Sequence, residues 1–331
     1  MKKTLYIFSS GELHRKQNTI YFLAKDGKRK YVPVENTCEI YIFGEVSINK
    51  KLLEFVSQQE IILHFFNHYG YYVGSFYPRE HYNSGFMILK QAEHYSDIAK
   101  RLYLARKFVS GAAQNMKKVL QYYTARDVEL IGYIQQIETL NKKIQVQKNI
   151  NELMAIEGNI REIYYQSFNQ IIKDENFSFY RRQKRPPKTK LNALISFGNS
   201  ILYTTVLSEI YKTHLDPRIG FLHSTNFRRF SLNLDVAEIF KPIIVDRVIF
   251  YLLNKGMIKP NHFYDELRGV YLNEKGRTFF VEEMDKRLKT TIKHRDIKKI
   301  VSNRRLIRLE LYKIEKHLMG EKEYEPFEAR W

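Results

Sequence analysis

The sequence is poor in cysteine, in long apolar runs and in acidic residues. Cys38 is the one cysteine among 331 residues, so a disulfide within the chain is impossible and a cysteine-based zinc site is excluded. No apolar run is long enough to span a bilayer. The apolar run near the N-terminus is broken by Ser9, Ser10 and Glu12, which leaves it too short for a signal-peptide core. These absences predict a reduced, cytoplasmic protein with no place in a membrane.

Several familiar motifs are missing as well. The chain has no P-loop, no G-x-G-x-x-G, no H-E-x-x-H, and no helix-turn-helix, zinc-finger or RNP signature. Acidic residues are outnumbered by basic ones, 36 against 55, which gives a formal net charge of +19. Hydrophobic residues make up 44% of the chain, enough for a folded core. The composition therefore predicts a folded protein with an anionic partner, and nothing in it indicates sequence-specific readout.

The spacing of the apolar residues changes once along the chain. Up to about Phe76 it is typical of strands, with a hairpin signal at Asp26-Gly27 and one helical stretch over 48–60. Turn residues fill 78–86, and after them the period is helical. Helices are predicted over 87–104, 102–124, 129–144, 150–173, 191–212, 234–255 and 274–318, with a proline-containing break at 181–190.

This organisation predicts an α+β protein. A small β-rich N-terminal domain covers 1–77, a linker covers 78–86, and a larger all-α domain covers 87–331. The polar residues that could carry chemistry lie in the larger domain, which we therefore expect to be the catalytic one.

Four residues of the helical part could form a site. His223 ends the stretch "LDPRIGFLH", and Asp235 and Glu238 share one face of the helix after it because they lie three positions apart. Glu157 precedes Gly158 inside a helical segment, where glycine is unfavourable. One interpretation is a metal site of carboxylates and an imidazole. The other is ordinary: acids on an exposed face or in a first helical turn, and a hydrogen-bonded histidine. The residues alone leave both open.

Basic residues gather in three runs. The first lies in "FYRRQKRPPKTK", the second flanks the candidate site, and the third extends along 286–308. A charge run is often only a solvated face, but three runs with a net charge of +19 favour a surface for a phosphate backbone. The signal indicates nucleic acid but not which kind, and the residues that we expect to contact it are Arg181, Arg182, Arg228, Arg229 and Lys241.

Four sequence blocks together resemble one known family. They are Glu157-Gly158, "NALISFGNSILY" at 192–203, "LDPRIGFLH" at 215–223 and "SLNLDVAEIFKPIIVDR" at 231–247, and the tail "YEPFEARW" fits too. Their order and spacing are similar to those of the CRISPR-associated adaptation integrase and endonuclease family, which inserts new spacers into a CRISPR array. The resemblance covers nearly the whole chain and is greatest to members of type I systems, subtype I-B.

The resemblance implies a metal site and a reaction. Glu157, His223 and Glu238 match the family's metal ligands, and Asp235 matches a further acid of the catalytic helix. Where relatives often have arginine in a "FRP" triplet, this chain has Lys241, which keeps the charge without the bidentate fork. Two carboxylates and an imidazole suit Mg²⁺ or Mn²⁺. The implied reaction is transesterification, in which the 3′-hydroxyl of a prespacer attacks a phosphodiester at the edge of the repeat.

The resemblance also implies partners. They are double-stranded DNA, both prespacer and CRISPR repeat, a second copy of the chain in a homodimer formed through the N-terminal domain, and a second, smaller dimeric adaptation protein. Two alternatives remain: a non-catalytic basic scaffold that binds nucleic acid, and an RNA-directed metal nuclease. An intact set of three ligand residues argues against the scaffold, and the choice of substrate separates the RNA nuclease from the integrase.

Overall fold

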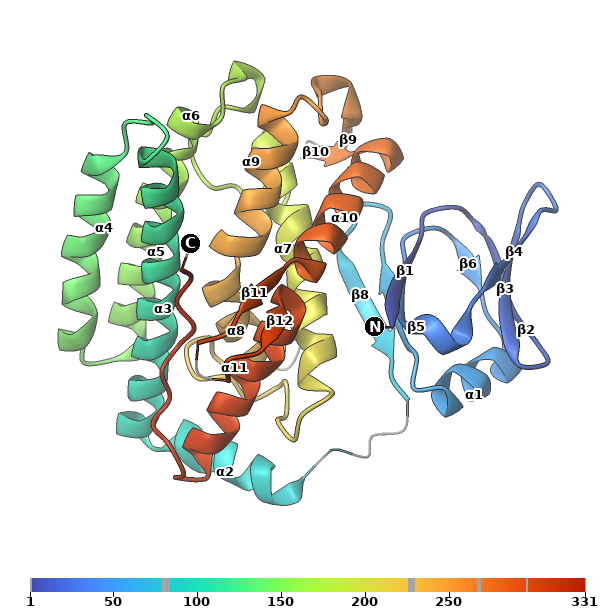
Figure 1. Cartoon of the computed structure of the whole chain (residues 1–331), viewed down its shortest axis with the longest axis horizontal. Coiled ribbons are helices and arrows are strands. Elements are labelled where there is room, and N and C mark those ends of the chain that lie inside the picture. The colour runs from blue at the N-terminus through green and yellow to red at the C-terminus, as the bar shows by residue number, and fades with distance from the viewer. Residues whose placement is uncertain are drawn as a thin grey trace. The chain divides into compact units, whose positions relative to one another are not determined.

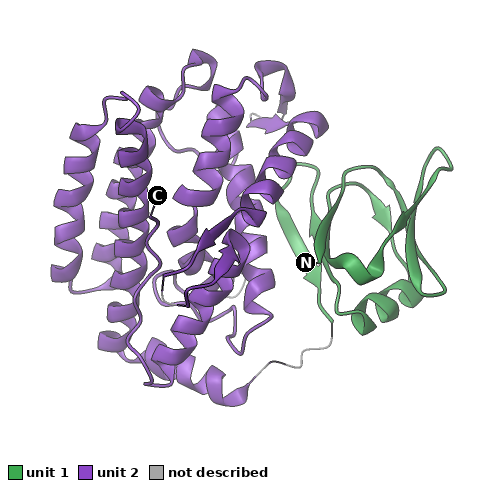
Figure 2. Cartoon of the chain, viewed as in Figure 1, with its two compact units in different colours: residues 1–81 green, residues 82–331 purple. Residues whose placement is uncertain are grey.

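The chain divides into two compact units, Met1–His81 and Tyr82–Trp331 (Figure 2). The structure, a computed structural model, describes residues 2–78, 82, 84–225, 230–266, 269–295 and 297–330. The linker expected over 78–86 lies partly outside these ranges. Its last two residues, Gly85 and Phe86, already belong to the first helix of unit 2.

Unit 1 is rich in strands, as the alternating apolar pattern predicts. Its described elements are β1 Lys3–Ile7, β2 Gly11–Lys16, β3 Thr19–Ala24, β4 Arg29–Val32, β5 Thr37–Ile42, β6 Val46–Ser47, α1 Lys50–Gln58, β7 Ile62–Phe66 and β8 Tyr72–Phe76 (Figure 1). They form two four-stranded sheets, in the orders β1-β5-β7-β8 and β4-β3-β2-β6. The Asp26-Gly27 hairpin is confirmed: β3 and β4 pair antiparallel around it, and Gly27 has the positive φ of +81° that this turn requires.

The core of unit 1 is an apolar cluster built from both sheets and α1. Leu13, Ile20, Ile40 and Leu63 are at most 1% exposed, and Leu52 of α1 packs into the same cluster. In β3 burial alternates along the strand, and this fixes the register, because a slip of one residue would turn its apolar set to solvent.

Unit 2 is mostly helical. Its described elements are α2 Gly85–Ser96, α3 Ile98–Thr124, α4 Ile131–Lys143, α5 Ile150–Gln166, α6 Phe168–Ile171, α7 Lys190–Ile210, α8 Leu232–Phe240, α9 Arg247–Asn254, β9 Phe263–Glu266, β10 Gly269–Leu272, α10 Glu274–Lys289, β11 Thr291–Lys293, β12 Ile300–Ser302 and α11 Asn303–Leu318. The α+β fold class is therefore confirmed. The two helices predicted over 87–104 and 102–124 meet earlier than predicted, at Asp97, whose side chain caps α3 by accepting from the backbone N–H of Lys100.

The single helix predicted over 274–318 is wrong. The chain leaves the helix at Thr290, and β11 and β12 form an antiparallel hairpin before α11 begins. The β-branched residues Thr291, Ile292, Ile300 and Val301 are suited to strands and disfavour a helix. The basic residues of this region therefore lie on two helices and a hairpin rather than along one rod.

Helix α7 is buried along almost its whole length and packs against α8 and α11. Near its end the fully buried carboxylate of Glu209 accepts hydrogen bonds from Arg304 (Nε, 2.7 Å) and Arg308 (Nη2, 2.6 Å) of α11 and from Lys212 (Nζ, 3.0 Å). Burial raises the pKa of Glu209, but these three cations outweigh it and lower the pKa to about 2. None of the helices in the described ranges combines the length and apolarity needed to cross a membrane.

A π-helical segment, Pro242–Asp246, joins α8 to α9. Pro242 has no N–H to donate, and the backbone N–H of Asp246 reaches back five residues to the carbonyl of Lys241 (3.1 Å). The predicted helix 234–255 is thus continuous in path but widened by one π turn. Single π turns of this kind occur often at functional sites.

Candidate active site

Asp235 organises the loop that ends at His223. Its carboxylate is fully buried. Oδ2 accepts from the backbone N–H groups of Phe221 (2.5 Å) and Leu222 (3.0 Å), and Oδ1 accepts from the N–H of His223 (2.9 Å). Oδ1 also lies 2.8 Å from His223 Nδ1. The imidazole is thereby held by Nδ1, and Nε2 is the ring nitrogen left for a ligand.

Side chains from two other helices hold the same loop. Gln91 of α2 donates to the carbonyls of Asp216 and Ile219 and accepts from the Asp216 N–H, all at 2.7–3.0 Å. Arg101 of α3 donates to the carbonyl of Phe221 (2.9 Å). The loop is therefore fixed along its length by hydrogen bonds that replace a regular element.

Gly220 is required by the closeness of Asp235. A Cβ at this position would lie 2.7 Å from Asp235 Oδ2 and 2.7 Å from the backbone carbon of Ser231. The glycine of "GFLH" therefore lets the loop backbone approach the carboxylate that orders it.

Glu157 and Glu238 meet through a guanidinium. Glu157 lies on α5, where Arg161 is one turn further along, and Arg161 Nε donates to Glu157 Oε1 at 2.6 Å. Arg161 Nη2 donates to Oε2 of Glu238, which projects from α8 and is 3% exposed. The helix α5 runs without interruption through Gly158, so this glycine neither starts nor breaks it. The structure thus brings the two predicted carboxylates to one cation.

Lys241 completes the group. Its Nζ lies 2.5 Å from Glu238 Oε1 and 4.8 Å from the centre of the Tyr203 ring on α7. Both Lys241 and Glu238 are almost fully buried. Lys241, which we expected to contact DNA, is thus an ion-pair partner inside the site.

Neighbouring charges shift the pKa values of Glu238 and His223. Burial raises the pKa of Glu238, yet Arg161 and Lys241 outweigh it and bring the pKa down to about 2. Burial lowers the pKa of His223, but the hydrogen bond and charge of Asp235 outweigh it, and Glu238 adds to the effect, so the pKa of His223 is raised. His223 therefore lies within electrostatic reach of Glu238 as well as in contact with Asp235.

A divalent ion fits the donor types present here. Two carboxylates and an imidazole whose Nδ1 is already engaged are suited to Mg²⁺ or Mn²⁺. Because Glu157 and Glu238 both bind one guanidinium, they already lie within reach of a single cation. No three His, Cys, Asp or Glu side chains of the described ranges converge closely enough to hold a metal by themselves. The structure therefore holds the carboxylates on Arg161 rather than gathering them with His223.

The other basic residues expected to contact DNA have different surroundings. Arg181 is exposed. Arg182 donates to Asn192 Oδ1 and Ser196 Oγ of α7, both at 2.9 Å, so its guanidinium ties the proline-containing segment to that helix. Arg228 and Arg229 lie outside the described residues.

Sequence reasoning missed Arg161 and Asp246. Arg161 follows Glu157 by four positions, which is the spacing of an ion pair on a helix and is a signal that could have pointed to it. Asp246 carried no such signal; the structure places it, fully buried, at the end of the π-helical segment.

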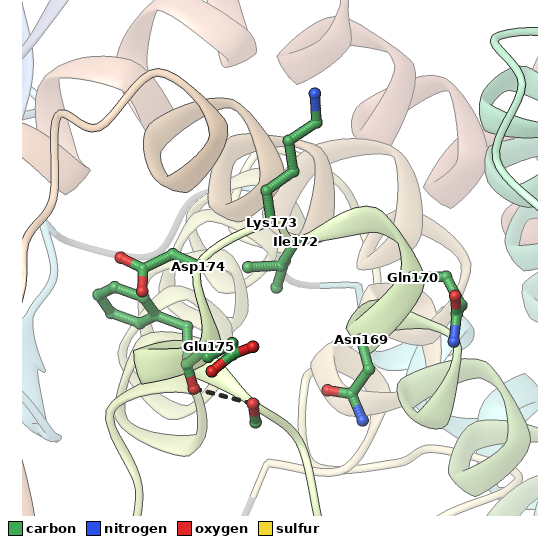
Figure 3. Close-up of a pocket in the computed structure, with 8 residues that line it drawn as sticks. Asn169, Gln170, Ile172, Lys173, Asp174 and Glu175 are labelled. Carbon is green, nitrogen blue, oxygen red and sulfur yellow. Dashed lines mark hydrogen bonds between the residues drawn. The ribbon is translucent and has the colours of Figure 1, made fainter.

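A cavity of about 370 Å³ lies elsewhere in unit 2, around the turn after α6 (Figure 3). Its lining residues are Asn169, Gln170, Ile172, Lys173, Asp174, Glu175, Phe177 and Ser178. None of them is a predicted site residue, and the lining offers no histidine. The candidate chemistry is therefore in the buried cluster on α5 and α8 and not in this cavity.

Comparison with known proteins agrees with this fold. Residues 5–286 match the family described as CRISPR associated protein Cas1. A relative from Thermodesulfovibrio yellowstonii, named CRISPR-associated endonuclease Cas1 2, is 63% identical over the full length of both chains. The solved structure of a Cas1 protein from Thermotoga maritima has a TM-score of 0.87 at 51% identity and covers 98% of this chain and 100% of that one. A casposase bound to integration product shares the fold, with a TM-score of 0.89 at 20% identity over 100% of this chain and 95% of that one.

The fold and the candidate site define a class of proteins with a strand-rich unit and a helical unit, in which a histidine and a buried carboxylate pair within the helical unit. The chain belongs to the CRISPR-associated Cas1 family. The resemblance read from the sequence blocks is thereby confirmed. Its refinement to subtype I-B stays a prediction.

Proposed function

We propose that this chain is a metal-dependent DNA endonuclease and integrase that inserts prespacer DNA into a CRISPR array. The observation that carries the proposal is the pairing of His223 with Asp235 beside two carboxylates held on one cation. Membership of a family whose relatives are named endonucleases supports it.

Each residue has a role in the proposed site. Glu157, His223 Nε2 and Glu238 hold Mg²⁺ or Mn²⁺, and Asp235 positions the imidazole without binding the ion, because both its oxygens are engaged by the loop. The bound ion would polarise the scissile phosphate and stabilise charge on the attacking and leaving oxygens.

The proposed reaction exchanges one phosphodiester for another. The 3′-oxygen of the prespacer forms a new bond to phosphorus, and the bond from phosphorus to the 3′-oxygen of the repeat strand breaks. The attacking hydroxyl loses its proton to solvent, and the departing oxygen gains one. Water in place of the hydroxyl gives hydrolysis, which accounts for endonuclease activity with the same groups.

The partners proposed are those that the family implies. Duplex DNA, as prespacer and as repeat, would be held by exposed basic residues such as Arg181, with an affinity that falls as salt rises. We also propose a homodimer and a complex with the second, smaller adaptation protein.

A strand-transfer assay tests the proposal. A fluorescent prespacer, a supercoiled repeat-bearing plasmid and the small partner protein are incubated with Mn²⁺ or with EDTA. The wild type is compared with Glu157→Ala and His223→Ala, and Glu162→Ala on the same helix serves as the control. Joined product that needs the ion, Glu157 and His223 but not Glu162 is the expected result.

Two other results would replace the proposal. Salt-sensitive DNA binding without joining under any condition would leave a non-catalytic scaffold. Comparable cleavage of RNA without strand transfer would indicate an RNA-directed nuclease. Binding of the labelled DNA, measured on the same variants, separates these outcomes from misfolding.

A further inference from the structure

One nitrogen of the Arg161 guanidinium makes no hydrogen bond to the described residues. Its Nε and Nη2 bind Glu157 and Glu238, whereas Nη1 is buried without a hydrogen-bond partner among the described residues. The residue is 9% exposed, so water does not replace the missing partner freely. A buried guanidinium that leaves one donor group unpaired is uncommon and calls for an explanation.

Asp246, on the π turn, is the complementary group. It is fully buried, and neither of its carboxylate oxygens has a hydrogen-bond partner in the described part of the chain. Burial raises the pKa of Asp246 to about 7, and the largest opposing effect comes from the charge of Arg161. The hydroxyl of Tyr164 lies close enough to lower the pKa of Asp246 as well, Lys241 also lowers it, and Glu238 raises it. Asp246 is therefore a buried acid without an ion pair, and the charged group that acts on it most strongly is the guanidinium of Arg161.

The charges of the site need such a group. Without a metal, Arg161 and Lys241 balance Glu157 and Glu238. A divalent ion on Glu157 and Glu238 adds two positive charges next to the buried cations Arg161 and Lys241. The repulsion between the ion and these cations is costly where water is excluded. Binding is favourable only if one cation moves away or gains a negative partner.

We propose that Arg161 is a resident cation that holds Glu157 and Glu238 in position until a divalent ion takes their oxygens, and that the guanidinium then pairs with Asp246. Asp246 and Arg161 are positioning residues in this scheme, since neither touches the reacting atoms. The inference rests on the proposed metal dependence and goes beyond it by naming where the displaced charge goes. The π turn has a role here, because it is the turn on which Asp246 lies.

Direct measurement of Mn²⁺ binding tests the scheme without relying on catalysis. The full chain, without DNA, is titrated with Mn²⁺, and free ion is followed by electron paramagnetic resonance. Asp246→Asn is expected to weaken Mn²⁺ binding by about tenfold, because the amide cannot take a charge. The matched control is Asp265→Asn on β9, an exposed aspartate outside the site. A merely structural role for Asp246 would lower the unfolding midpoint without changing Mn²⁺ affinity.

A second variant keeps the test decisive if Asp246→Asn folds poorly. Arg161→Gln removes the competing cation, so it should bind Mn²⁺ at least as tightly as the wild type. In that background, Asp246→Asn should change the affinity by less than about twofold, because the two residues act as one pair.

The outcomes are distinct. Wild-type affinity in Asp246→Asn, or a clear loss of affinity in Arg161→Gln, would overturn the exchange of partners and leave the metal-dependent function standing. Absence of Mn²⁺ binding by the wild type, in a chain that is folded by circular dichroism, would overturn both.

Discussion

His223 Nδ1 lies 2.8 Å from Oδ1 of Asp235, and the same carboxylate accepts the backbone N–H groups of 221, 222 and 223. One buried acid thus orders the loop backbone and the imidazole at its end. In the proposed site, Asp235 therefore orients the imidazole of His223 rather than binding the ion. Histidines in metal sites are commonly held in this way.

Asp235→Asn should lower the pKa of His223. In the wild type the hydrogen bond and charge of Asp235 outweigh the effect of burial, so the pKa of His223 is raised above its ordinary value of 6.5. In the variant burial dominates and the value falls below 6.5. NMR titration of the histidine ring protons measures it, with Asp265→Asn as control. An unchanged His223 titration would contradict the pairing. Strand transfer should fall by about 10–100-fold, the usual effect of losing such a partner.

Lowering the pH should reduce the folding stability of the metal-free protein, because Glu238 becomes protonated. Its pKa of about 2 lies below the ordinary 4.5 because Arg161 and Lys241 outweigh burial. The carboxylate therefore contributes stability above pH 4.5 that is lost as the pH falls from 4.5 towards 2, on the order of 3 kcal/mol in all. Urea unfolding at pH 7, 4 and 3 should show Glu238→Gln far less stable than the wild type at pH 7, with the gap narrowing at pH 3. A gap that stays constant with pH would refute this.

Gly220→Ala should destabilise the loop. The added methyl meets Asp235 Oδ2 and the Ser231 backbone at 2.7 Å, and neither is the free end of a flexible side chain. We expect a cost of about 1–3 kcal/mol and a clear loss of strand transfer. Gly132→Ala on α4 is the matched control, since a Cβ there meets nothing within 4 Å. That variant should gain about 0.5–1 kcal/mol, so opposite signs in urea unfolding are the expected result.

Asn115→Ala should loosen helix α8 and the C-terminal segment together. Asn115 of α3 is buried and donates to the carbonyls of Ile239 and Phe327, both at 2.9 Å, and accepts from the N–H of Ala329 at 2.8 Å. Each buried group left unpaired costs about 1–3 kcal/mol. Hydrogen exchange should rise at 239–241 and 327–329, while Asn159→Ala, at an exposed position of α5, should leave both segments unchanged. Faster exchange in only one segment would show that they are not coupled.

Much of the fold follows from local pattern, and the site follows only in part. The hairpin at Asp26-Gly27 and the change to a helical period depend on neighbouring residues, so the sequence predicts them. The prediction of one helix over 274–318 is wrong because the basic residues around Thr290 and Ile300 are compatible with a helix. The β-branched residues among them instead pair as strands. "GFLH" and the acids of α8 indicate the site by spacing.

What the site does with these residues depends on contacts between distant segments. Arg161 bridges α5 to α8 across 77 positions, and this reach cannot be read from a helical period. The same holds for Asp246, whose full burial and interaction with Arg161 are properties of the folded structure.

The buried ion pairs of Glu209 with Lys212, Arg304 and Arg308 predict how this basic protein responds to concentrated salt. At about 1 M salt, charges in solvent are screened beyond roughly 3 Å, so nucleic acid held on exposed lysines and arginines should wash away. The bonds to Glu209 are 2.6–3.0 Å long and converge on a carboxylate that solvent does not reach. Concentrated salt should therefore release bound nucleic acid from the protein, whereas the ion pairs that hold α7 against α11 should persist.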